Sequence, residues 1–408
     1  RVTAPPSDPR GEDSRMTDAQ NHIADSYGVP VGGRAPRWGR QLAVEAAWHA
    51  LATVGCFWLL LKVIPVTGAI GWLVMAVTVL IWVHVCLRRQ SKVLRPAVAA
   101  GSQTALGGAN RLTLARGLLV SCLAGFLLVP DSLLMGQGRI LAWLPSVIYL
   151  SAALLDGVDG IWARRRGQVT DLGRKLDTEM DALGLLVASA LGVSLNRLPV
   201  AYLAAGAAYY LFHLGIWRRH ANGLPVLDLP FRPFARTVAG LQMGYAGVAL
   251  MPLFPADFVG LAGYCFLLPL LTGFVWDWWV VSGRSSQSVP HRTLSWCRRL
   301  SRWLPLLCRG ILLLFAMPVI QSLSWVFPVS WSLVWWVLCV LMVLGTAGRL
   351  SGLLSACLLG LSTPGGESSP ETMLVFSASL MLLVFGTGGW SCWEPENRVL
   401  ALPFGART

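Results

Sequence analysis

Four aspartates, Asp156, Asp159, Asp177 and Asp181, have a spacing that could support metal chemistry. The first two are three residues apart and the last two are four apart, so on a helix each pair shares one face. Long apolar runs flank the stretch on both sides, and two neighbouring helices would bring the carboxylates together beside hydrocarbon. Charges are unfavourable there, and like charges repel one another. A divalent cation bound between the aspartates would remove the conflict.

The ligand type indicates which cation this would be and what it would bind. All-oxygen, carboxylate-rich ligation suits Mg²⁺ or Mn²⁺. A Mg²⁺ ion held by a few carboxylates usually shares its remaining positions with substrate phosphates, so the sequence predicts a pyrophosphate-containing substrate. Gly160, Ala163 and Gly173 are small residues beside the aspartates that leave room for a nucleotide. Arg164 could pair with a phosphate.

The complete stretch resembles the signature of a known family. It follows the pattern D-x-x-D-G-x-x-A-R-x8-G-x-x-x-D-x-x-x-D, which is similar to that of the CDP-alcohol phosphatidyltransferases, membrane enzymes of phospholipid synthesis. The resemblance implies that the four aspartates bind the metal and that Asp181 is also the general base on the acceptor hydroxyl. It implies attack on the donor's β-phosphate with CMP leaving, and a homodimer. The residues implied to surround the CDP moiety are Gly160, Ala163, Arg164 and Gly173.

A second motif, N-R-L-T-L-A-R, begins at Asn110. Asn110, Thr113 and Arg116 recur every three residues, so they line one side of the start of a helix. The family often has N-x-x-T-x-x-R at this point, which implies that Asn110 and Thr113 bind CDP and that Arg116 binds the acceptor. A helix cap is the alternative reading of so short a motif.

Composition places the chain among α-helical membrane proteins. It has 408 residues, 55% of them hydrophobic and 13% charged, with a mean hydropathy of +0.59. Repeated apolar runs of about twenty residues fit membrane-spanning helices. The net charge of +13 indicates basic loops facing anionic lipid, and no nucleic-acid partner is expected. The nine cysteines include no C-x-x-C pair, which argues against a disulfide framework or a thiolate metal site.

We therefore predict an all-α polytopic membrane protein with a six-helix CDP-alcohol phosphatidyltransferase-like core and extra transmembrane helices at both ends. The expected regions are a disordered polar tail over 1–40, a transmembrane hairpin over 41–87, a catalytic core over 88–285 that opens with an interfacial segment, and C-terminal membrane helices of unassigned role over 286–408. The core helices are expected over 111–130, 139–163, 175–196, 199–217, 236–254 and 257–281. The helices outside the core carry no carboxylate cluster, so they are expected to be dispensable for the chemistry.

Lysine and arginine are concentrated on alternate loops, which predicts the orientation. The tail and the aspartate stretch would face the cytoplasm, in a multi-pass protein of the cell (inner) membrane. Four arginines between the fourth and fifth core helices would lie on the same side: Arg218, Arg219, Arg232 and Arg236. We interpret them as an acceptor-phosphate pocket, with ordinary positive-inside charge as the alternative.

The segment G-Q-V-T-D-L-G-R-K-L-D is most similar to the bacterial phosphatidylglycerophosphate synthase branch of the family. That resemblance implies CDP-diacylglycerol as donor and glycerol 3-phosphate as acceptor. The branch usually continues D-P-x-A-D-K, whereas here Asp177 is followed by Thr-Glu-Met-Asp-Ala, so inositol phosphate or another alcohol stays open. Two other classes fit less well. Membrane prenyltransferases carry their aspartate motifs on helices far apart in sequence, and a divalent-cation carrier would need polar groups along a whole path.

Overall fold

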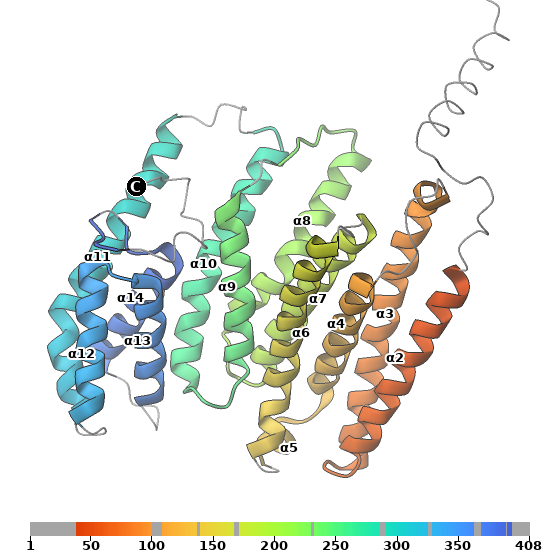
Figure 1. The fold of residues 1–408 in the computed structure, drawn as a ribbon, viewed down its shortest axis with the longest axis horizontal. Coiled ribbons are helices and arrows are strands. Elements are labelled where there is room, and N and C mark those ends of the chain that lie inside the picture. Colours follow the sequence, from red (N-terminus) through yellow and green to blue (C-terminus); the bar gives the residue numbers. More distant parts are fainter. Residues whose placement is uncertain are drawn as a thin grey trace, which may run out of the picture.

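The fold was taken from a computed structural model, which describes residues 38–99, 108–136, 139–166, 171–229, 232–284, 291–324, 329–362, 369–388 and 390–393. The predicted tail over 1–40 falls almost wholly outside these residues. The described part is helical, and its one extended pairing is an isolated bridge between Thr346 and Trp393. Figure 1 shows the helices side by side, from α2 at the right to α11–α14 at the left.

Three groups of helices follow one another along the chain. The N-terminal hairpin consists of α2 (Trp38–Leu60) and α3 (Val66–Ala99). The central group consists of α4 (Gly108–Gly125), η1 (Phe126–Leu128), α5 (Asp131–Gly136), α6 (Arg139–Arg166), α7 (Asp171–Ser194), η2 (Val200–Tyr202), α8 (Leu203–Ala221), α9 (Pro233–Ala249) and α10 (Ala256–Val281). The C-terminal group consists of α11 (His291–Ser324), α12 (Val329–Leu344), α13 (Gly348–Ser362) and α14 (Pro370–Phe385).

The prediction of an all-α polytopic membrane protein is confirmed. Seven of the described helices are long and apolar enough to cross a membrane: α2, α3, α4 with η1, α6, α8 with η2, α10 and α11. Two segments differ from the sequence-based expectation. The helix expected to end near residue 87 continues to Ala99 as α3, and the first C-terminal membrane helix, α11, is one continuous helix that begins at His291. Arginine and leucine recur in both stretches, and these residues favour continued helix.

The N-terminal hairpin belongs to the same apolar core as α4, α6 and α7. Trp72 of α3 is 1% exposed, and its indole Nε1 donates a hydrogen bond to the carbonyl oxygen of Cys122, at 3.0 Å. A Cβ atom at Gly125 would lie 2.5 Å from the Trp72 ring, so only glycine permits this approach. His49 Nδ1 and His84 Nε2 are 3.1 Å apart and join α2 to α3. This packing gives the hairpin a part in positioning α4.

A second apolar core joins α8, α9 and α10 to α11–α14. The rings of Phe258 in α10 and Phe376 in α14 meet edge to face with centroids 4.8 Å apart. The C-terminal helices carry no carboxylate cluster, but two arginines, Arg309 and Arg349, are buried among them. Arg309 Nη2 donates to the carbonyl oxygen of Thr387 at 2.6 Å. These contacts hold the segment after α14 against α11.

Candidate active site

The first wall of the site is one face of α4. Asn110, Thr113 and Arg116 follow one another at intervals of one helical turn, and all three are buried. Polar groups in a membrane helix are expected to face the protein interior, because lipid offers them no partner. The helix face predicted from the N-x-x-T-x-x-R motif is therefore an interior face of the structure.

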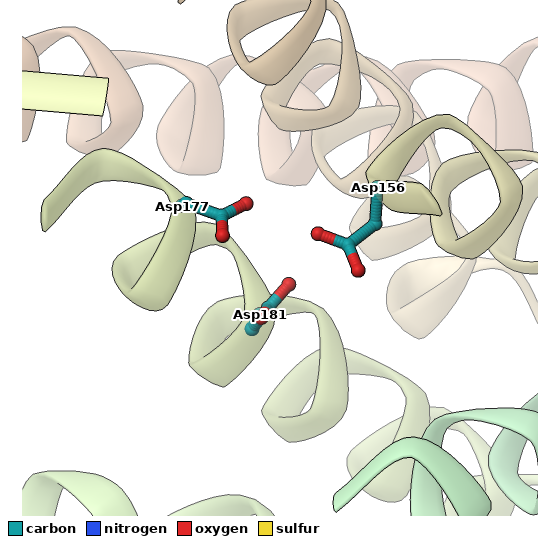
Figure 2. A group of neighbouring side chains, drawn as sticks. All are labelled: Asp156, Asp177 and Asp181. Carbon is teal, nitrogen blue, oxygen red and sulfur yellow. The ribbon is translucent and has the colours of Figure 1, made fainter. Parts of the chain in front are cut away.

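The second wall is formed by α6 and α7. Asp156 lies in the C-terminal half of α6, and Asp177 and Asp181 lie one turn apart in the N-terminal half of α7. Figure 2 shows the three carboxylates pointing toward one another from these two helices. One oxygen from each lies within 4.8 Å of the others. The structure thus brings together three of the four aspartates that were predicted to bind a metal.

Arg116 occupies the centre of this group. Its Nη1 lies 2.7 Å from Asp156 Oδ1 and also contacts Asp177 Oδ1, while its Nη2 contacts Asp181 Oδ1. The arginine side chain is 4% exposed, whereas the three carboxylates are 29–39% exposed. The carboxylates therefore line an accessible surface with the guanidinium behind them. Sequence reasoning assigned Arg116 to the acceptor and did not anticipate this contact.

The other residues predicted to surround CDP lie on the same helices. Gly160 is one turn beyond Asp156 on α6, and Gly173 is one turn before Asp177 on α7; both are half-buried. Asp159, Ala163 and Arg164 are in α6, but their side chains are outside the described residues. Because helical neighbours four residues apart share a face, the two glycines lie beside Asp156 and Asp177 and add no side chain there.

Tyr149 is a site residue that the sequence did not reveal. It lies in α6 two turns before Asp156, is 4% exposed and is near enough to Asp181 to interact with it electrostatically. Its ring packs beside Gly184 of α7, where a Cβ atom would lie 3.6 Å from Tyr149 Cε2, an ordinary van der Waals contact. Tyr149 therefore lies beneath the carboxylates, at the apolar end of the site. Its interval of seven residues from Asp156, which repeats a helix face, is the signal that could have found it.

The donor set fits a divalent cation. Carboxylate oxygens are hard ligands of the type that such cations prefer, and they converge here without any thiolate or imidazole among the described residues of the group. The oxygens are also partly exposed, so an ion and a substrate could reach them together. Asp156, Asp177 and Asp181 could thus hold a metal ion.

The comparison with known families agrees with this geometry. A sequence model described as CDP-alcohol phosphatidyltransferase matches residues 107–275. Residues 107–275 belong to the CDP-alcohol phosphatidyltransferase family. No curated protein and no solved structure matches the chain.

The phosphatidyltransferase segment includes α4, α6, α7, α8, α9 and most of α10, and it contains all three converging aspartates. It is an enzyme segment, a phosphotransferase for substituted phosphate groups in phospholipid synthesis. The hairpin α2–α3 and the helices α11–α14 lie outside the match. Family membership confirms the resemblance carried by the aspartate stretch.

The four arginines predicted to bind the acceptor lie around the connection from α8 to α9, and two of them have partners there. Arg232 forms an ion pair with Asp277 of α10. Arg219 donates to the carbonyl oxygens of Pro225, at 2.8 Å, and Ser282, at 3.1 Å. Arg218 and Arg236 are exposed. Arg219 and Arg232 thus brace α8, α9 and α10 at this end of the phosphatidyltransferase segment.

Proposed function

We propose that this protein transfers a phosphatidyl group from CDP-diacylglycerol to a phosphorylated polyol, glycerol 3-phosphate in the first instance, and releases CMP. The observation that carries the proposal is the convergence of Asp156, Asp177 and Asp181 on Arg116 within the segment that belongs to the family. The oxygen donors support a divalent metal, and the small residues beside them support a nucleotide.

The metal would be Mg²⁺ or Mn²⁺, held by Asp156, Asp177 and Asp181 with Asp159 as a further ligand. When bound, it would supply positive charge for the transferred phosphate and for the CMP that leaves. Asn110, Thr113, Gly160, Ala163, Arg164 and Gly173 would enclose the CDP moiety. Asn110 and Thr113 can offer it hydrogen bonds from the buried face of α4.

Asp181 would be the general base. It is the least exposed of the three carboxylates, at 29%, and a base must lie within hydrogen-bond reach of the proton that it removes. The acceptor hydroxyl would lose its proton to Asp181 while its oxygen forms a bond to the donor's β-phosphorus. The bond from that phosphorus to the CMP oxygen would break, and CMP would leave with the bonding electron pair.

Two features support a phosphorylated acceptor: the positive charge at the α8–α9 connection, and the resemblance of the segment G-Q-V-T-D-L-G-R-K-L-D to the phosphatidylglycerophosphate synthase branch. Arg218 and Arg236 are exposed at the α8–α9 connection, and guanidinium groups match the geometry of a phosphomonoester. A neutral alcohol would not require them. Inositol phosphate is the rival acceptor. The homodimer implied by the resemblance stays a prediction.

We expect an acceptor competition to decide the substrate. The purified protein, supplied with CDP-diacylglycerol and Mn²⁺, should release CMP fastest with glycerol 3-phosphate. Arg236→Ala should raise the KM for this acceptor by about tenfold, the loss expected for one hydrogen bond to a charged group. Equal or faster turnover with a non-phosphorylated alcohol would contradict the proposed acceptor. Arg218 and Arg236 would then be ordinary positive-inside charges.

We further propose that the site faces the cytoplasm from the cell membrane. The basic residues Arg174 and Arg218 lie near the helix ends that carry the aspartates, and Arg88 lies in the C-terminal half of α3, whereas Lys62, Arg139 and Arg197 are the basic residues of the opposite turns. Positive charge favours the cytoplasmic side.

Cysteine labelling should test this orientation. In intact cells, a membrane-impermeant thiol reagent should modify a cysteine introduced at exposed Ser132 of α5. It should modify one introduced at exposed Asn222, after α8, only once the membrane is permeabilised. The unmodified chain gives the background, since its Cys392 is exposed. Labelling of the cysteine at position 222 but not of the one at position 132 in intact cells would show the opposite orientation.

A further inference from the structure

Arg116 makes an unusual set of contacts for a residue expected to bind substrate. Its guanidinium is buried, at 4% exposure, and contacts one oxygen from each of Asp156, Asp177 and Asp181. These oxygens belong to the same three carboxylates that could hold a metal ion. A buried arginine is stable only when its charge is paired, and here three carboxylates provide the pairing.

The charges of these four groups do not cancel. The three carboxylates outnumber the single guanidinium, so these four described groups together keep a net negative charge, which a divalent cation can neutralise. The guanidinium and the cation would nevertheless attract the same oxygens and repel each other across a few ångströms. In a partly buried site, such a repulsion changes an equilibrium constant by more than tenfold.

We infer that Arg116 is the resident counter-ion of the aspartate cluster: it holds the three carboxylates together before metal binds, and it competes with the metal for them. The inference rests on the proposed function, because it takes the cluster to be the metal site. In this role Arg116 positions the carboxylates, and replacing it should change the affinity for the metal. If Arg116 contacted the acceptor directly, replacing it would instead raise the KM for the acceptor.

The test measures Mn²⁺ binding to the purified full-length protein by isothermal titration calorimetry and by electron paramagnetic resonance, without any substrate. Arg116→Gln removes the positive charge and should tighten Mn²⁺ binding by about tenfold or more. In EDTA the same variant should unfold at a lower temperature than the wild type, because three carboxylates lose their counter-ion. Saturating Mn²⁺ should restore much of that loss.

The matched control is Arg111→Gln on the same helix. Arg111 is 58% exposed and its Nε pairs with Glu45, at 3.0 Å, outside the cluster. Its loss removes the same charge from α4 and should leave Mn²⁺ affinity within about twofold of the wild type, since exposed charges are screened. If Arg111→Gln tightens Mn²⁺ binding as much as Arg116→Gln does, the effect is one of general charge and the inference is wrong.

A second variant covers the case in which Arg116→Gln does not fold. Arg116→Lys keeps the charge but lacks the fork that reaches several carboxylates at once, so Mn²⁺ should bind about threefold or more tighter than to the wild type. Unchanged or weaker Mn²⁺ binding in the folded variant overturns the inference.

The two proposals fail in different ways. If the wild type and the Arg116→Gln variant both release CMP and bind Mn²⁺ with equal affinity, the counter-ion role is wrong and the proposed function stands. If neither the wild type nor the variant binds Mn²⁺, or if Asp177→Asn leaves Mn²⁺ affinity unchanged, the aspartate cluster is not the metal site and both proposals are wrong.

Discussion

Replacing Asp181 by asparagine is expected to lower the rate of CMP release by about 100-fold or more, the size of lost general acid–base catalysis. Asparagine keeps the shape and the hydrogen-bonding capacity of the side chain but cannot accept the acceptor's proton. Asp181 is also one of the three carboxylates that converge, so the change weakens the metal site as well. Both effects act on the reaction and neither requires the helix to move.

The measurement is CMP release from CDP-diacylglycerol at saturating Mn²⁺ and acceptor, with thermal unfolding as the check on folding. Glu179→Gln is the matched control, because it removes the same charge two residues away on α7. Glu179 accepts a hydrogen bond from Tyr209 Oη of α8, at 3.3 Å, and is not one of the converging carboxylates. It should keep activity within a few-fold. Full activity of folded Asp181→Asn protein would remove Asp181 from the mechanism.

The affinity for the donor separates the two roles of the aspartates. Asp181→Asn should weaken binding of CDP-diacylglycerol less than Asp159→Asn does, because Asp159 is proposed as a ligand alone and Asp181 as ligand and base. Equal losses of donor affinity would argue that Asp181 acts through the metal alone.

The part of the site that could be predicted is the part set by spacing within one helix. Intervals of three and four residues fix which side chains share a helix face. The sequence therefore indicated that Asp177 lies beside Asp181, and that Asn110, Thr113 and Arg116 line one face of α4. The apolar runs also gave the helices of the core, since lipid leaves few other choices for the backbone.

Contacts between distant segments could not be predicted in the same way. Arg116 is 61 residues from Asp177 and 65 from Asp181, and its interaction with both depends on how α4 packs against α7. Spacing gives the face of each helix but not the partner that the face meets. An arginine in a family that binds phosphates was thus assigned to substrate, whereas its contacts in the structure are with carboxylates.

The N-terminal hairpin illustrates the same limit. It has no carboxylate cluster, so the sequence indicated that it was dispensable for chemistry. In the structure α3 shares one apolar core with α4 and α7, the two helices that carry Arg116, Asp177 and Asp181. A helix with no chemical group can still fix the distance between two helices that have them.

Gly117 provides the strongest test of this positioning role. It follows Arg116 on α4, and a Cβ atom at this position would lie 2.8 Å from Val83 Cγ1 of α3 and 3.0 Å from Met180 Sδ of α7. Gly117→Leu would therefore force α4 away from α3, from α7, or from both. Met180 directly precedes Asp181, so the displacement would reach the carboxylates.

We expect Gly117→Leu to lower CMP release by about 100-fold, because a shift of about 1 Å in reacting groups has an effect of that size. The variant should also unfold at a lower temperature, since overpacking a filled core costs about 1–3 kcal/mol. Gly260→Leu in α10 is the control, because a Cβ atom there meets nothing within 4 Å, and it should retain activity and stability. If Gly117→Leu is as active as the Gly260 control, α3 does not set the spacing of α4 and α7. The hairpin would then be dispensable for the chemistry, as the sequence alone indicated.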